Sequence, residues 1–269
     1  MPIEWLLYPL LGVVAGLLAG LLGVGGGLVL VAALALLLPA QGVPADAAIH
    51  AALATSLASV VVTACASAYA HHKRGGVLWP SVAWLLPGLL LGGWLGSGIA
   101  KGIAGADLRW FVVGYCLLAA LQLALDLPRK PAGSPAPDPA APAPTGPGLS
   151  VAGAFIGAVS ALVGIGGGSM TVPLLVWRGV APVRAVGTSS ACGIAIGLSA
   201  AAGYASGGNV PGMPTGSLGY VFLPAAIGIA LTSVAMAPYG AALAHRVRPL
   251  TLKRIFAGFL LAMAAVLAW

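Results

Sequence analysis

The chain has 269 residues, of which 60% are hydrophobic and only 6% are charged, and its formal net charge is +7 at pH 7. This composition excludes a soluble domain with a charged surface and predicts an all-α protein, a polytopic bundle of transmembrane helices. The Lys and Arg residues are scattered over short connections and form no basic stripe. We therefore expect no nucleic-acid partner and attribute the positive charge to orientation in the lipid bilayer.

The first apolar stretch runs from Trp5 to Leu38, which is too long for one upright crossing of a membrane. It contains the glycine-rich segment Gly23-Val24-Gly25-Gly26-Gly27, and glycine interrupts a helix. No basic leader precedes this stretch, so we expect it to be retained. Apolar stretches long enough to span a membrane, about 20 residues, follow at 46–70, 77–99 and 108–126.

A linker is predicted at 128–148, where the sequence is rich in proline, alanine and glycine. A second interrupted stretch follows from Leu149 to Trp177 and contains Gly164-Ile165-Gly166-Gly167-Gly168. Three further spans are predicted at 182–206, 216–240 and 250–268.

The order of features before the linker returns after it, which indicates a duplication into repeats at 1–127 and 149–269. Each glycine-rich segment is preceded by small residues at every fourth position, a ridge that lets another helix approach closely in lipid. The matching features are Gly12, Gly16 and Gly20 with Gly153, Gly157 and Ala161; Ala54-Thr55-Ser56 with Gly187-Thr188-Ser189; Leu86-Pro87 with Leu223-Pro224; and Leu108-Arg109 with Leu252-Lys253.

The distribution of Lys and Arg bears on whether each interrupted stretch crosses once or returns as a hairpin. With single crossings, eight of the twelve basic residues fall on one face of the membrane. With hairpins the division becomes ten against two, with only Lys101 and Arg109 on the minor face. The positive-inside rule therefore favours hairpins, inverted repeats and termini that both face outward. A reporter fused after Trp269 that proved cytoplasmic would reject this topology.

Each glycine-rich segment is predicted to present backbone N–H groups beside a helix start, an uncharged cradle for an anion. The simpler alternative is that these glycines only permit close packing. A nucleotide-binding loop is disfavoured because no GK[ST] sequence is present. We expect the two cradles and two hydroxyl clusters to meet near the bilayer centre and bind substrate through Gly25, Gly26, Gly27, Thr55, Ser56, Gly166, Gly167, Gly168, Ser169, Thr188, Ser189 and Ser190.

The hydroxyls of the second span also have a structural interpretation. Thr55, Ser59, Thr63 and Ser67 recur every four residues, and such side chains commonly bond to the carbonyl four residues back. Two ionisable residues remain as candidates: His50 for proton coupling, or for capping a helix, and Arg184 for attracting an anion, or for anchoring a helix end.

No catalytic or metal-binding constellation is visible, so we expect neither an enzyme nor a cofactor. Cys65, Cys116 and Cys192 lie within apolar segments without metal-ligand spacing and are interpreted as reduced packing residues.

The segments Leu22-Gly23-Val24-Gly25-Gly26-Gly27 and Val163-Gly164-Ile165-Gly166-Gly167-Gly168-Ser169-Met170-Thr171-Val172-Pro173, each followed by an Ala/Gly-Thr-Ser helix start, resemble the repeated motif of the sulfite exporter TauE/SafE family. The first half departs from the motif, with Ala51 at the place of Arg184 and Ala32 at the place of Pro173.

The resemblance implies a multi-pass permease of the bacterial cytoplasmic (inner) membrane that moves a small sulfur-containing or carboxylated anion, such as sulfite or an organosulfonate. Its expected partners are the small anionic substrate and the lipid bilayer, and a homodimer is left open. The alternatives are a channel or carrier for a neutral or cationic solute, with the glycines as a hinge, and a membrane scaffold that transports nothing.

Overall fold

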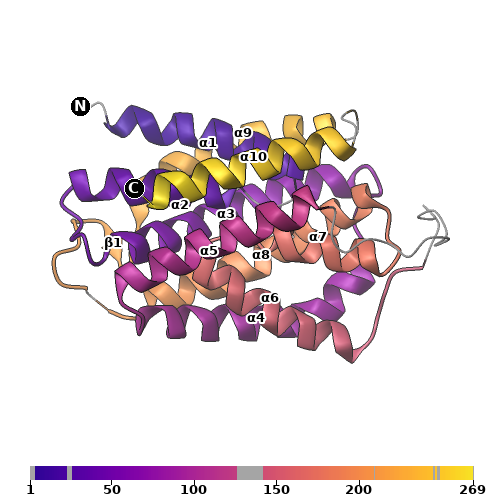
Figure 1. Cartoon of the computed structure of the whole chain (residues 1–269), viewed down its shortest axis with the longest axis horizontal. Coiled ribbons are helices and arrows are strands. Elements are labelled where there is room, and N and C mark those ends of the chain that lie inside the picture. Colours follow the sequence, from indigo (N-terminus) through magenta and orange to yellow (C-terminus); the bar gives the residue numbers. More distant parts are fainter. Residues whose placement is uncertain are drawn as a thin grey trace.

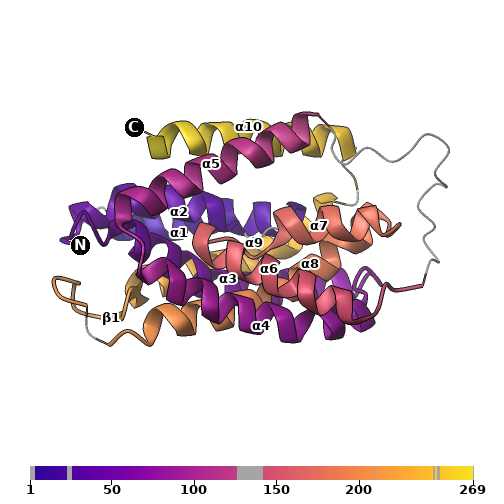
Figure 2. The same ribbon diagram turned by 60° about the horizontal axis from the view of Figure 1, so that its bottom comes forward.

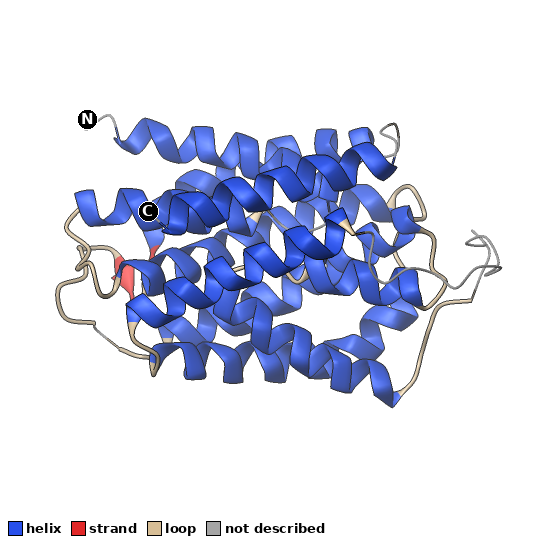
Figure 3. Cartoon of the chain, viewed as in Figure 1, coloured by secondary structure: helices blue, strands red, loops and turns tan. Residues whose placement is uncertain are grey.

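The computed structural model describes residues 4–22, 26–125, 142–208, 210–244, 246 and 249–268. Within these residues the chain is almost entirely helical, as Figure 3 shows, and the predicted all-α bundle is confirmed. The elements are α1 (Glu4–Leu22), α2 (Gly27–Ala40), α3 (Ala48–His72), α4 (Trp79–Lys101), α5 (Gly105–Ala124), α6 (Pro147–Val163), α7 (Gly168–Trp177), α8 (Pro182–Ala205), β1 (Ser217–Leu218), β2 (Val221–Phe222), α9 (Leu223–Ala244) and α10 (Pro249–Ala268). Most of the predicted linker at 128–148 lies outside the described residues.

Helix length and composition agree with a membrane protein. Four helices of the described chain, α3, α4, α8 and α9, are long and apolar enough to cross a bilayer. Shorter apolar helices flank the glycine-rich segments, because both long apolar stretches are interrupted where the sequence predicts.

The interruptions have a backbone cause. Gly164 ends α6 with φ +77°, and Gly26 and Gly167 precede α2 and α7 with φ +66° and +78°. This left-handed conformation costs glycine little and side-chain-bearing residues considerably more. The glycines therefore end one helix and start the next in a different direction.

Both interrupted stretches fold back as helical hairpins. The Tyr8 hydroxyl near the start of α1 donates a hydrogen bond to Gln41 Oε1, directly after α2. In the second half, Ala143, just ahead of α6, packs in one apolar cluster with Val176 near the end of α7. Figure 1 shows α1 starting at the left end of the bundle and α6 starting at the right end, so the two hairpins enter from opposite ends.

The first helix of each half packs against the fourth helix of the other half: α1 lies along α9, and α6 lies along α4 (Figures 1 and 2). Helices α3 and α8 pack against each other in the middle, and α5 packs on α10. A Cβ built on Gly16 would lie 2.4 Å from the Ser233 carbonyl oxygen, and one on Gly157 would lie 2.6 Å from the Leu89 carbonyl oxygen. The prediction that both small-residue ridges allow close helix approach is thus confirmed.

Basic residues separate between the two ends of the bundle. Arg74 lies beyond α3 and Arg178 beyond α7, at the end where Gly76 contacts Gly187 near the start of α8. At the opposite end, Lys101 Nζ donates to the Gly203 carbonyl oxygen near the end of α8, and Arg109 donates to the Leu267 carbonyl oxygen near the end of α10. These positions agree with the ten-against-two division of Lys and Arg residues that favours hairpins. Which end of the bundle faces the cytoplasm stays a prediction.

This orientation can be tested with two exposed threonines, Thr145 ahead of α6 and Thr215 between α8 and β1. In a variant whose three native cysteines are replaced, we expect a membrane-impermeant maleimide added to intact cells to label Thr215→Cys but not Thr145→Cys. Both should be labelled after the membrane is permeabilised, which controls for reactivity. The reverse pattern would contradict the positive-inside orientation.

Candidate functional site

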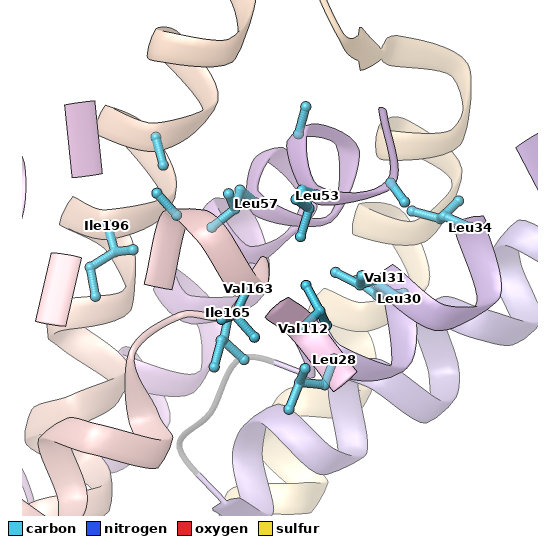
Figure 4. Packing of buried hydrophobic residues seen from close by; sticks show 14 of the residues in the cluster. Leu28, Leu30, Val31, Leu34, Leu53, Leu57, Val112, Val163, Ile165 and Ile196 are labelled. Atoms are coloured by element: carbon cyan, nitrogen blue, oxygen red, sulfur yellow. The ribbon is translucent and has the colours of Figure 1, made fainter. Parts of the chain in front are cut away.

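The two glycine-rich interruptions touch each other inside the bundle. A Cβ built on Gly27, at the start of α2, would lie 2.3 Å from the Gly164 carbonyl oxygen and 3.1 Å from Ile165 Cα. A Cβ on Gly164 would lie 2.4 Å from Val31 Cγ2. Figure 4 shows the apolar side chains packed around this contact, with Leu53 and Leu57 of α3 beside them. The two glycine-rich segments, more than a hundred residues apart in the sequence, therefore pack directly against each other.

A single buried hydroxyl connects the two interruptions. Ser56 Oγ on α3 lies 3.0 Å from the Gly27 carbonyl oxygen and 3.0 Å from the Gly164 carbonyl oxygen, and it donates to this pair. The Gly164 carbonyl lies past the end of α6, where it lacks an intrahelical donor and needs a partner inside the protein when no water is present. Ser56, predicted as a substrate-binding residue, thus holds the two interruptions together.

Both hairpins place a helix start in the interior. Gly26 precedes α2 and Gly167 precedes α7, and neither helix start has a hydrogen bond from a capping side chain. Gly166, Gly167 and Gly168 are buried, as are Gly26 and Gly27, while Gly25 lies outside the described residues. The positive end of each helix dipole therefore faces the middle of the bundle, as the predicted cradles require.

Hydroxyl groups gather at the second interruption. Ser169 Oγ, in the first turn of α7, is 2.5 Å from the Tyr115 hydroxyl of α5. Ser160 Oγ of α6 would lie 3.4 Å from a Cβ on Gly167. Ser160 and Thr171 are fully buried, and their hydroxyls have no hydrogen-bonding partner among the described residues. Tyr115, Ser160 and Thr171 are not among the site residues predicted from the sequence.

Thr55 and Thr188 occupy matching places and make matching bonds. The Phe222 N–H donates to Thr55 Oγ1 at 3.0 Å, and the Leu78 N–H donates to Thr188 Oγ1 at 3.0 Å. Each threonine thus binds a backbone N–H of the other half, ahead of α9 or α4. Thr188 also donates to the Arg184 carbonyl oxygen at 2.7 Å. These bonds give both threonines a structural role, and substrate binding by them stays a prediction.

The other predicted hydroxyls lie along the α3–α8 contact. Ser190 Oγ is 3.1 Å from the Val186 carbonyl oxygen and 3.0 Å from Ser67 Oγ, and Ser189 is fully buried. Ser59 donates to the Thr55 carbonyl oxygen at 2.9 Å, the bond four residues back that the alternative interpretation anticipates.

His50 and Arg184 lie toward the ends of the bundle. His50 is buried, and its Nε2 is 3.0 Å from the Ala100 carbonyl oxygen and 3.1 Å from the Ile103 carbonyl oxygen. Since both partners are acceptors, Nε2 carries the proton and caps the end of α4. Arg184 is half-buried in the first turn of α8. Proton coupling and anion attraction stay predictions.

Within the described residues, no three His, Cys, Asp or Glu side chains lie close enough to hold a metal ion. The groups at the two interruptions are hydroxyls, carbonyl oxygens and helix starts, which suit hydrogen bonding and not metal-ion catalysis.

The matched threonine bonds lead to a test. Thr55→Val and Thr188→Val keep the side-chain shape but leave a buried N–H without its acceptor, so each should lower the free energy of unfolding by about 1–3 kcal/mol. Thr55→Ser and Thr188→Ser, which keep the hydroxyl, should be milder. Thermal unfolding of the purified variants measures this. A valine variant of normal stability that binds substrate poorly would instead show a direct ligand role.

Comparison with known proteins agrees with this architecture. The family model described as sulfite exporter TauE/SafE matches residues 8–267. A relative from Haemophilus influenzae described as a probable membrane transporter protein is 36% identical over 262 residues, which cover 96% of each chain. No solved structure matches. Because the match extends over both halves, this multi-pass membrane protein belongs to the sulfite exporter TauE/SafE family of transporters.

Proposed function

We propose that the protein is a secondary transporter that moves a small sulfur-containing or carboxylated organic anion, of the sulfite or organosulfonate class, across the bacterial cytoplasmic membrane by alternating access. The observation that carries this proposal is the contact between the two interruptions, where the Ser56 hydroxyl bridges the carbonyl oxygens of Gly27 and Gly164. A bundle whose interrupted helices meet in its interior has the architecture of a mid-membrane binding site.

The chemistry of the site favours an anion. Two helix starts direct their positive dipole ends inward, and the hydroxyls around α7 can donate hydrogen bonds. No Lys or Arg occurs in the sequences of α2, α6 or α7. Binding by dipoles and hydroxyls leaves an oxyanion without a fixed counter-charge, and such weaker binding allows release on the far side.

Alternating access is supported by pairs of matching bonds at opposite ends of the bundle. His71 Nε2 lies 3.1 Å from the Gly20 carbonyl oxygen, and the Tyr204 hydroxyl donates to the Ala161 carbonyl oxygen at 3.0 Å. Gly20 and Ala161 are matching positions of the two repeats. Together with the crossed packing of α1 on α9 and α6 on α4, this supports inverted repeats at 1–127 and 149–269 that rock against each other about the central contact.

Counterflow in proteoliposomes tests the proposal. Vesicles with purified protein are loaded with unlabelled sulfite or sulfoacetate, and uptake of the labelled anion is followed from outside. We expect saturable uptake that internal anion accelerates, because a carrier returns faster when loaded. Flux that does not saturate would indicate a channel, and wild-type vesicles no more permeable than protein-free vesicles would contradict the proposal.

A further inference from the structure

The two interruptions share their glycines but differ in the residues around them. The repeats align with an offset of 141 residues at the glycine segments, which pairs Ser160 with Ala19, Ser169 with Leu28 and Thr171 with Leu30. The offset between Arg109 and Lys253 pairs Tyr115 with Phe259. Each of the four hydroxyls at the second interruption is therefore replaced by an apolar side chain at the first.

The four hydroxyl-bearing residues lie in the first turn of α7 or next to it. Tyr115 and Ser169 bond to each other, and Ser160 Oγ lies against Gly167, whose carbonyl oxygen accepts the Thr171 N–H at 2.8 Å. Ser160 and Thr171 are fully buried, with no partner for their hydroxyls in the described part of the chain. A buried hydroxyl without a partner is unfavourable, and a bound ligand with acceptor oxygens would supply the missing bonds.

Among its described residues, the first interruption offers no buried hydroxyl without a partner, because the Ser56 hydroxyl beside it bonds to the carbonyl oxygens of Gly27 and Gly164. Leu28 and Leu30 are fully buried in the main apolar core, and Figure 4 shows them among its other aliphatic side chains. The Ala19 carbonyl oxygen is within reach of Ser67 Oγ, at 3.5 Å. The start of α2 is thus packed among aliphatic side chains and held by the already bonded Ser56 hydroxyl, which indicates a structural role.

We propose that the two interruptions have unequal roles: the oxyanion binds at the second, between the start of α7 and the hydroxyls of Tyr115, Ser160, Ser169 and Thr171, and the first is its structural counterpart. This rests on the proposed function and names its binding groups. Hydroxyl oxygens also suit a small cation, but the positive dipole end of α7 favours an anion.

The test combines counterflow of labelled sulfite with thermal unfolding of the full-length protein. Ser160→Ala, Thr171→Val and Tyr115→Phe should each raise the KM for counterflow about tenfold, the loss expected for one hydrogen bond to a charged ligand. Each should also reduce the rise in melting temperature that sulfite produces in the wild type. Thr171→Ser, which keeps the hydroxyl, should show the wild-type KM and the wild-type rise in melting temperature with sulfite.

Two controls separate binding from packing. Ser59→Ala removes a buried hydroxyl that donates to the Thr55 carbonyl oxygen of its own helix and lies 3.4 Å from the Ala226 carbonyl oxygen of α9, away from α7. Leu30→Met changes the position that matches Thr171. Both should leave the KM unchanged.

The proposal fails if wild-type counterflow is saturable and the three variants around α7 keep its KM, or if Leu30→Met raises the KM equally. It also fails if sodium, and not sulfite, raises the melting temperature of the wild type and Ser160→Ala abolishes that rise. Absence of counterflow in the wild type would instead overturn the proposed function itself.

Discussion

The dominant constraint on this fold is that hydrocarbon supplies no hydrogen bonds to a broken backbone. Each glycine-rich segment ends one helix and begins another, which leaves carbonyl and N–H groups without their usual partners. The chain satisfies part of this need by bringing the two segments together, so that Ser56 of α3 donates to the Gly164 carbonyl oxygen past the end of α6 and also contacts the Gly27 carbonyl oxygen at the start of α2. The interruptions are therefore tolerated as a pair, which accounts for their position in the interior.

The rest of the bundle positions that pair. Glycine ridges let α1 lie against α9 and α6 against α4 at distances that a side chain would not allow. Thr55 and Thr188 then hold the backbone ahead of α9 and α4, and His71 and Tyr204 bind carbonyl groups near the ends of α1 and α6. Every one of these last bonds has a counterpart in the other half, as the proposed repeats would require.

Sequence reasoning predicted what depends on local pattern. Apolar length predicted the helices, except that the start of the span predicted at 216–240 forms the β1–β2 hairpin and α9 begins only at Leu223. Glycine content predicted both interruptions, and residue spacing predicted the ridges at Gly12 and Gly153. It did not predict the contact of Gly27 with Gly164 or the partners of Thr55 and Thr188, because these pairings depend on distant segments. Nor can the identity of Ser160 or Thr171 show whether its hydroxyl has a partner. Comparing the halves for positions that are polar in one and apolar in the other would have identified both residues.

The central claim, that one hydroxyl joins the two interruptions, can be tested by hydrogen exchange measured by mass spectrometry. Ser56→Ala should accelerate backbone exchange in both hairpins, at the start of α2 and around the end of α6, while Ser206→Ala, which removes an exposed hydroxyl, should accelerate neither. Faster exchange in only one hairpin, or in neither, would contradict the account.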